Sequence, residues 1–149
     1  MDIKGKTVAI TGAARGIGKS LAVAFAQKGA RLALIDLSMD DLSVTATLCA
    51  EAGAEARTYG CNVTKEDEVV TTLNAIAADF GALDVMLNNA GIVKDGLLVK
   101  VKDGAVVGKM SLDQWNAVLN VNLTGVFLCG REAAEHMIRF GKGGVIINM

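Results

Sequence analysis

Five short apolar segments recur along the chain, and the longer segments between them repeat apolar residues at helical spacing. The short segments are Thr7–Thr11, Leu32–Asp36, Glu55–Tyr59, Val85–Asn88 and Val145–Met149. Apolar runs without polar alternation are typical of strands that are covered on both faces, as in a parallel sheet. The alternation of strand and helix therefore predicts an α/β fold with right-handed crossovers.

Capping patterns and glycines predict where the helices begin and end. Three helices are predicted to begin at a hydroxyl cap that is followed three residues later by an acid or amide: Ser38 with Asp41, Thr64 with Asp67, and Ser111 with Gln114. Three helices are predicted to end at or near a glycine: Gly29, Gly53 and Gly81.

The segment Leu97–Met110 does not fit the alternation of strands and helices. It alternates apolar residues with lysines and then reaches Asp103-Gly104. Asp-Gly between alternating runs is a strong hairpin signal, because both central positions of the turn need a positive φ. We predict a β-hairpin inserted after the fourth strand, with a flexible loop as the alternative. We expect it to border the substrate pocket or a subunit contact.

Length and composition limit the classes of protein that fit. The chain has 149 residues, which is close to one domain, and 52% of them are apolar. We find no linker and predict a single domain over residues 1–149. Fifteen basic and sixteen acidic residues give a net charge of −1. This balance offers no basic field for nucleic acid.

The cysteines and the apolar runs bear on location. Three widely spaced cysteines form no metal-binding pattern, so we expect no metal site and reduced thiols in a cytoplasmic protein. The opening residues lack the apolar core of a signal peptide. No apolar run approaches the roughly 18 residues that span a membrane, so we expect no membrane partner.

A glycine-rich turn joins the first strand to the first helix. It reads Thr11-Gly12-Ala13-Ala14-Arg15-Gly16-Ile17-Gly18. Without Cβ atoms, the backbone amides of such a turn can approach a diphosphate closely, and the helix N-terminus adds positive charge. The turn therefore predicts a dinucleotide site. The alternative is a turn that merely packs closely, and the glycine spacing disfavours FAD or S-adenosylmethionine as ligands.

Asp36 ends the second strand, 18 residues after Gly18. A carboxylate there accepts hydrogen bonds from the adenosine ribose and repels a 2′-phosphate, which favours NAD over NADP. Arg15 has the opposite effect, since its guanidinium could pair with that phosphate. We give Asp36 more weight and expect NAD, with NADP the weaker candidate. Asp36 could instead serve only as a helix-capping carboxylate.

Three motifs occur in order along the chain: Thr11-Gly12-x-x-x-Gly16-Ile17-Gly18, Asn88-Asn89-Ala90-Gly91 and Asn120-Val121-Asn122. Together they resemble the classical short-chain dehydrogenase/reductase family, and within it the 3-oxoacyl-acyl-carrier-protein reductase group. The resemblance covers the whole chain. It implies a Rossmann-type doubly wound parallel sheet, with about five strands present here. It also implies hydride transfer between a nicotinamide cofactor and a small carbonyl or secondary alcohol substrate.

The resemblance also implies roles for individual residues. The cofactor contacts that it implies are Gly12, Arg15, Gly16, Ile17, Gly18, Asp36, Leu37, Asn62, Val63, Asn89, Ala90, Gly91 and Val121. Asn62 stands where the family usually has aspartate beside the adenine, and we expect its amide to accept from the adenine amino group. Asn122 matches the catalytic asparagine, whose backbone holds a water in a proton relay, often at an irregular helix turn.

The family's catalytic serine and its Tyr-x-x-x-Lys pair have no counterpart in these 149 residues. The only tyrosine, Tyr59, has Val63 four residues later. We therefore expect an N-terminal cofactor-binding portion that is inactive alone, from a parent that forms a homodimer or homotetramer through a stretch like Ser111–Arg139. The competing hypothesis is a non-enzymatic dinucleotide-binding sensor or scaffold. We expect the only histidine, His136, on a helix surface, and Trp115 in core or interface packing.

Overall fold

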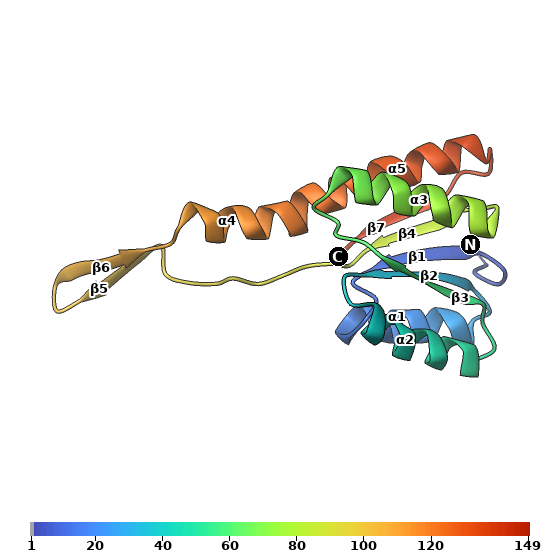
Figure 1. Ribbon diagram of the computed structural model, residues 1–149, viewed down its shortest axis with the longest axis horizontal. Helices are drawn as coiled ribbons and strands as arrows, with labels where there is room; N and C mark the ends of the chain where they lie inside the picture. The colour runs from blue at the N-terminus through green and yellow to red at the C-terminus, as the bar shows by residue number, and fades with distance from the viewer. Residues whose placement is uncertain (1) are drawn as a thin grey trace.

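A five-stranded parallel sheet forms the central layer of the protein, as a computed structural model of residues 2–149 describes it (Figure 1). Its strands are β1 (Thr7–Thr11), β2 (Arg31–Asp36), β3 (Ala56–Gly60), β4 (Val85–Asn88) and β7 (Val145–Asn148). They lie in the order β3-β2-β1-β4-β7, and every pairing is parallel. The chain builds outward from β1 to β3 and then crosses to the other side of β1, which confirms the doubly wound fold.

Two pairs of helices cover the two faces of this sheet. The helices α1 (Gly16–Gln27) and α2 (Met39–Glu51) lie on one face, and α3 (Glu66–Phe80) and α5 (Val126–Arg139) lie on the other (Figure 1). The strands serve both layers because alternate side chains point to opposite faces. In β1, Val8 and Ile10 belong to the core beneath α1 and α2, whereas Ala9 belongs to the core beneath α3 and α5.

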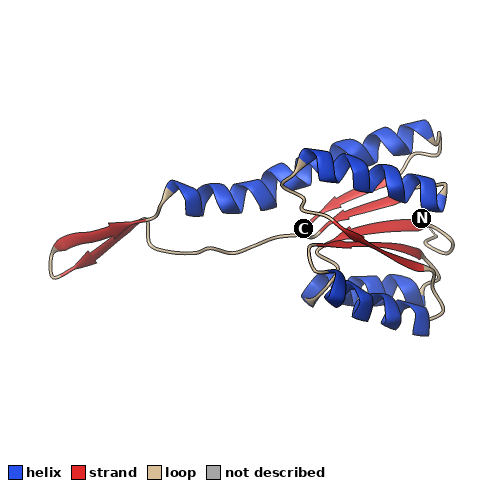
Figure 2. Cartoon of the chain, viewed as in Figure 1, coloured by secondary structure: helices blue, strands red, loops and turns tan. Residues whose placement is uncertain are grey.

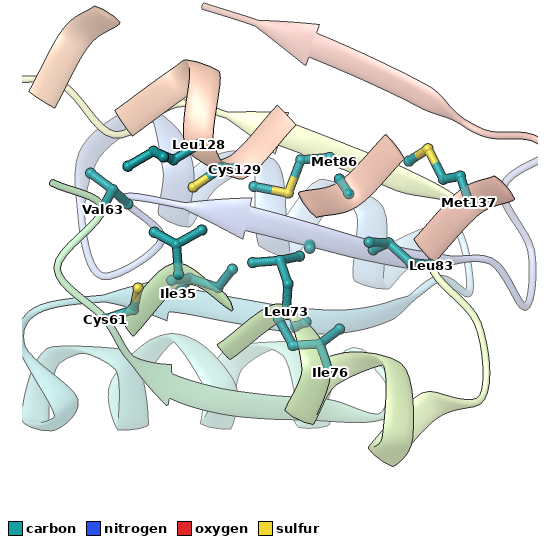
Figure 3. Packing of buried hydrophobic residues seen from close by; sticks show 14 of the residues in the cluster. Ile35, Cys61, Val63, Leu73, Ile76, Leu83, Met86, Leu128, Cys129 and Met137 are labelled. Carbon is teal, nitrogen blue, oxygen red and sulfur yellow. The ribbon is translucent and has the colours of Figure 1, made fainter. Parts of the chain in front are cut away.

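The core beneath α3 and α5 is the larger of the two layers. Leu73 and Ile76 of α3 and Cys129 of α5 pack there with Met86 of β4 (Figure 3). Leu73, Ile76 and Met86 are at most 1% exposed. Leu73 and Ile76 are spaced so that they share one side of α3, which is the helical spacing of apolar residues noted in the sequence.

The inserted hairpin is present and stands apart from the sheet. Its strands, β5 (Val99–Lys102) and β6 (Ala105–Lys109), pair antiparallel. Asp103 and Gly104 have φ values of 51° and 78°, as the predicted turn requires. Figure 2 shows the hairpin at the end of an arm that α4 (Leu112–Leu119) and a long loop connect to the sheet.

Two of the three predicted caps are confirmed, and the third is wrong. Ser38 accepts from Asp41 N (3.3 Å), and Ser111 forms a full capping box with Gln114. Helix α3 begins after Lys65 without a side-chain cap. Thr64 instead directs its backbone N–H and its hydroxyl to Asn62 Oδ1. The Thr64 hydroxyl therefore bonds to the side chain of Asn62 in a local turn and does not cap the helix.

His136 is buried, so the prediction of a surface histidine is wrong. Its side chain lies on the sheet-facing stripe of α5 with Cys129 and Ala133, and its ring stacks with Phe140 at a centroid distance of 6.3 Å. Trp115 is 52% exposed on α4, which excludes core packing within the described chain. None of the helices in residues 2–149 is long and apolar enough to cross a membrane.

The three thiols Cys49, Cys61 and Cys129 are buried and unpaired. Burial raises the pKa of each, that of Cys129 to about 12. Less thiolate is therefore present in the folded protein at pH 8 than in an unfolded chain. We expect fewer than one thiol per chain to react with Ellman's reagent in the time that denatured protein reacts fully. Rapid reaction of all three in folded protein would contradict the packing.

Candidate functional site

The glycine turn between β1 and α1 lies against the end of β4. Gly12 has a φ of 68°, and a Cβ on it would lie 2.9 Å from Ala90 Cα. A Cβ on Gly18 would collide with Gly12 O and lie 2.6 Å from Asn89 Nδ2. Any larger residue would push these segments apart, so both glycines are required for the close approach.

The beginning of α1 is open to a ligand. A Cβ on Gly16 would meet nothing within 4 Å, although the φ of 55° at this position still favours glycine. Arg15 precedes the helix in an extended conformation, without a side-chain cap, and no acid occupies the first turn. The first N–H groups and the positive end of the helix dipole are therefore available to an anion.

Asp36 ties the end of β2 to this turn. Its Oδ2 accepts from Ala14 N at 3.0 Å, and its Oδ1 accepts from Leu37 N at 2.7 Å. Two backbone donors thus fix the carboxylate beside the glycine turn. Each oxygen keeps a lone pair for a ligand hydroxyl.

Thr11 joins the ends of β1 and β4, a role that sequence reasoning missed. Its hydroxyl accepts from Asn89 N and Ala90 N, both at 3.0 Å, and donates to Leu87 O at 3.4 Å. Asn89 Nδ2 in turn donates to Thr11 O and Gly12 O. The one signal in the sequence was a hydroxyl residue directly after a buried apolar strand.

Asn122 lies in a π-helical turn, Asn120–Gly125, between α4 and α5. Its Oδ1 accepts from Ile92 N at 2.9 Å, and its Nδ2 donates to Ile92 O at 3.0 Å. The side chain therefore holds the backbone just after Gly91. Sequence reasoning did not single out Ile92, whose role comes from a contact 30 residues away.

These elements enclose a crevice of about 340 Å³ at the carboxyl edge of the sheet. The predicted residues that line it are Gly12, Arg15, Ile17, Asp36, Leu37, Asn62, Val63, Asn89, Ala90, Gly91 and Val121. Gly16 and Gly18 belong to the turn but do not line the crevice. Asn122 does not line it either, but forms hydrogen bonds with Ile92, which does. Ile35, Cys61 and Ile92 line it as well and were not predicted.

The amide of Asn62 has only one polar end left for a ligand. Its Oδ1 accepts from Thr64 N (3.0 Å) and from the Thr64 hydroxyl (2.8 Å), which uses both lone pairs of that oxygen. For Nδ2, the structure records no hydrogen bond within residues 2–149. At the crevice Asn62 is thus a donor, and the expectation that its amide accepts from the adenine amino group is wrong, because Thr64 occupies the oxygen. An aspartate there would be an acceptor.

The thiol and the phenol nearest the crevice are both held in their protonated forms. Burial raises the pKa of Cys61, which keeps the thiol protonated. Tyr59 lies outside the crevice and donates to Asp79 at 2.7 Å, and burial raises its pKa further from neutrality. In residues 2–149 no three metal-ligating side chains are grouped to share an ion. The arrangement suits a ligand with an anionic centre and polar ends.

Comparison with known proteins gives one consistent family. Residues 6–149 match the family model described as short chain dehydrogenase. The chain is 35% identical over 146 residues to the 3-oxoacyl-[acyl-carrier-protein] reductase of Thermotoga maritima. The alignment covers 98% of this chain and 56% of that protein. It is 36% identical to the D-threitol dehydrogenase of Mycolicibacterium smegmatis, with coverage of 99% and 53%.

Solved structures agree with this likeness. A short-chain type dehydrogenase/reductase from Mycobacterium marinum matches with a TM-score of 0.87 at 37% identity, covering 99% of this chain and 56% of that one. An NAD⁺-bound xylitol dehydrogenase matches with a TM-score of 0.85 at 33% identity, covering 99% and 54%. The chain thus spans about half the length of the relatives it matches.

Two glycines of the turn provide a matched test of this geometry. Gly18→Ala places a methyl group against Gly12 O and Asn89, so we expect it to destabilise the protein by about 3 kcal/mol, the upper end of the usual range for overpacking. Gly16→Ala meets open space and costs only the left-handed backbone conformation, about 1 kcal/mol. Urea unfolding of both variants measures the difference, and equal losses would contradict the close approach at Gly18.

Proposed function

Because the chain belongs to the short-chain dehydrogenase family, we propose that it is the cofactor-binding portion of an oxidoreductase. The whole protein would transfer hydride between a nicotinamide dinucleotide and a small carbonyl or secondary alcohol substrate. The observation that carries this proposal is the crevice at the carboxyl edge of the sheet. It lies where the strand order reverses between β1 and β4, the position at which doubly wound folds bind dinucleotides.

The residues present fit such a cofactor. In this proposal the N–H groups at the start of α1 hold the pyrophosphate, with Gly12, Arg15, Gly16, Ile17 and Gly18 forming the turn around it. The open space beside Gly16 and the uncapped helix start support this placement. The remaining contacts divide between the adenosine end, with Asp36, Leu37, Asn62 and Val63, and the nicotinamide end, with Asn89, Ala90, Gly91 and Val121.

We assign NAD as the preferred cofactor. Asp36 supports this choice because two backbone N–H groups fix its charge beside the turn. A 2′-phosphate bound there would meet a like charge that cannot rotate away without losing both hydrogen bonds. Arg15 also lines the crevice and offers NADP partial compensation.

In the bound cofactor the nicotinamide ring supplies the hydride chemistry. The part that we assign to this chain is orientation and proton handling near that ring. Asn122 uses its side chain to hold Ile92, which fixes the segment Asn89–Gly91. A π-helical turn leaves backbone carbonyl groups without their usual partners. This supports a role for the Asn122 backbone in holding a relay water.

The proposed parent protein acts on a small molecule and assembles as a homodimer or homotetramer. Support for assembly comes from apolar side chains left exposed along the helical stretch from α4 to α5, such as Leu112, Trp115 and Phe127 at 70%, 52% and 59%. Buried apolar area drives most protein association, so a stripe of this kind favours a partner helix. We place the protein in the cytoplasm, in keeping with its reduced, buried thiols.

The same two measurements, on the 149-residue chain and on the complete protein, test the function. NADH titrated into the 149-residue chain should bind and enhance nicotinamide fluorescence, without turnover of any carbonyl substrate. The protein expressed from its complete reading frame should bind NADH equally and reduce a panel of small ketones. Binding without turnover by the complete protein would favour the sensor or scaffold hypothesis. Absence of binding by both would refute a dinucleotide site.

The cofactor preference should respond to the charge of Asp36. Asp36→Asn keeps an acceptor for Ala14 N but removes the negative charge. We expect the ratio of NADPH to NADH affinity to rise at least about tenfold, or about 1.4 kcal/mol. Arg15→Ala is the matched control and should shift the ratio the other way. Calorimetry with both cofactors measures the ratio, and an unchanged ratio in Asp36→Asn would overturn the assignment.

The base preference should respond to Asn62. The Nδ2 of Asn62 is a donor. We therefore expect a dinucleotide with hypoxanthine in place of adenine to bind more tightly than NADH, because the 6-keto oxygen of hypoxanthine accepts a hydrogen bond and the 6-amino group of adenine does not. Asn62→Asp presents only acceptors and should reverse the preference, changing the ratio of the two dissociation constants about tenfold. A ratio that is the same in both proteins would show that residue 62 does not read the base.

A further inference from the structure

The hairpin at the end of the arm has two chemically different faces. Val101 pairs with Val106, Val99 pairs with Lys109, and a bulge after Lys100 adds Val107 beside Val106. Cross-strand partners share a face of the ribbon, as do residues two apart on one strand, so Val99, Val101 and Val106 lie on one side together with Lys109. The bulge sets Val107 beside Val106, and we call this side the valine face. Lys100 and Lys102 lie on the other side, opposite Gly108 and Ala105.

Nothing in residues 2–149 covers the valine face. Val99, Val101, Val106 and Val107 are 47%, 59%, 58% and 53% exposed. The main contact of β5 is with β6, and Figure 1 shows both strands at the far end of the arm from the sheet. A two-stranded hairpin without a packing partner is marginally stable in water. A surface that covers the valine face would therefore stabilise the hairpin.

We propose that the valine face packs against the valine face of a second copy of this chain, across a twofold axis. A contact of this kind must be self-complementary, because the same patch meets itself. A flat ribbon of β-branched side chains meets that condition, since two such faces can stack as the layers of a sandwich do. The two hairpins together would form a four-stranded unit with an apolar interior.

The charges of the hairpin support this occupant. Lys100 and Lys102 point away from the contact, so stacking brings no like charges together. Lys109 lies at the base of the hairpin, and Asp103 lies at its tip. A twofold axis across the strands sets the base of one hairpin beside the tip of the other. Lys109 of each chain then lies near Asp103 of the second copy, twice by symmetry. An acidic partner would instead select the lysine face.

The size of the surface determines what this contact can do. Standard interfaces bury roughly 800 Å² on each partner, more than four half-exposed valines provide. The flanking residues Leu97 and Leu98 are about 70% exposed and extend the apolar area. We therefore infer that the hairpin contact joins subunits within a larger assembly. It is separate from the α4–α5 stripe and does not depend on the proposed oxidoreductase activity.

Single cysteines on the two faces test the contact in the protein expressed from its complete reading frame. Val101→Cys places a thiol on the valine face, and Lys100→Cys places one on the opposite face of the same strand. The native thiols are buried and protonated, so they give little background. With a short bis-maleimide at micromolar protein, we expect Val101→Cys to form a covalent homodimer at least tenfold faster than Lys100→Cys.

Equal cross-linking from both faces would overturn the proposal. The proposal would also be overturned if Val101→Cys were protected from a monofunctional maleimide while no dimer formed. The valine face would then be covered by the remaining part of the same chain or by another protein. The double variant Val101→Lys, Val106→Lys provides an independent test. Sedimentation should show the assembly mass fall by half while the far-UV circular dichroism of the sheet and helices stays unchanged. An unchanged mass would also contradict the proposal.

Discussion

The close approach of two strand ends is the constraint on which the rest of the structure depends. Thr11 at the end of β1 accepts from the backbone of Asn89 and Ala90 at the end of β4, and the Asn89 amide returns two hydrogen bonds to the glycine turn. This approach is possible only because Gly12 and Gly18 carry no Cβ. It sets the position of α1 relative to β4, and thereby the width of the crevice and the direction of the free N–H groups.

The same constraint organises the chemistry that we propose. Once β4 is held against the turn, the segment after it emerges at one wall of the crevice, where Asn122 holds Ile92. Asp36 fixes the opposite wall through Ala14. A ligand in the crevice therefore meets an anion site in the middle, with a carboxylate and an amide donor at one end and a fixed backbone at the other. A dinucleotide has the matching order of groups.

The sequence predicted the features that depend on local physics. The strands were placed to within about one residue. For β1, β2 and β4 the reason is burial, since buried runs lack alternation, whereas β7 is exposed along its length. Asp103-Gly104 predicted the hairpin through its need for positive φ. It failed where distant or competing contacts decide. Thr64 donates to Asn62 and so does not cap α3, and His136 is buried because it lies on the side of α5 that faces the sheet. Thr11 and Ile92 gain their roles from partners 78 and 30 residues away.

A crystal structure of the protein with NADH bound tests the central claim most directly. The account predicts the pyrophosphate within hydrogen-bonding distance of the first backbone N–H groups of α1, with the adenosine ribose hydroxyls on Asp36. It also predicts the nicotinamide beside the segment that Asn122 holds. A dinucleotide bound away from the glycine turn, or a pyrophosphate that makes no contact with the start of α1, would contradict the account.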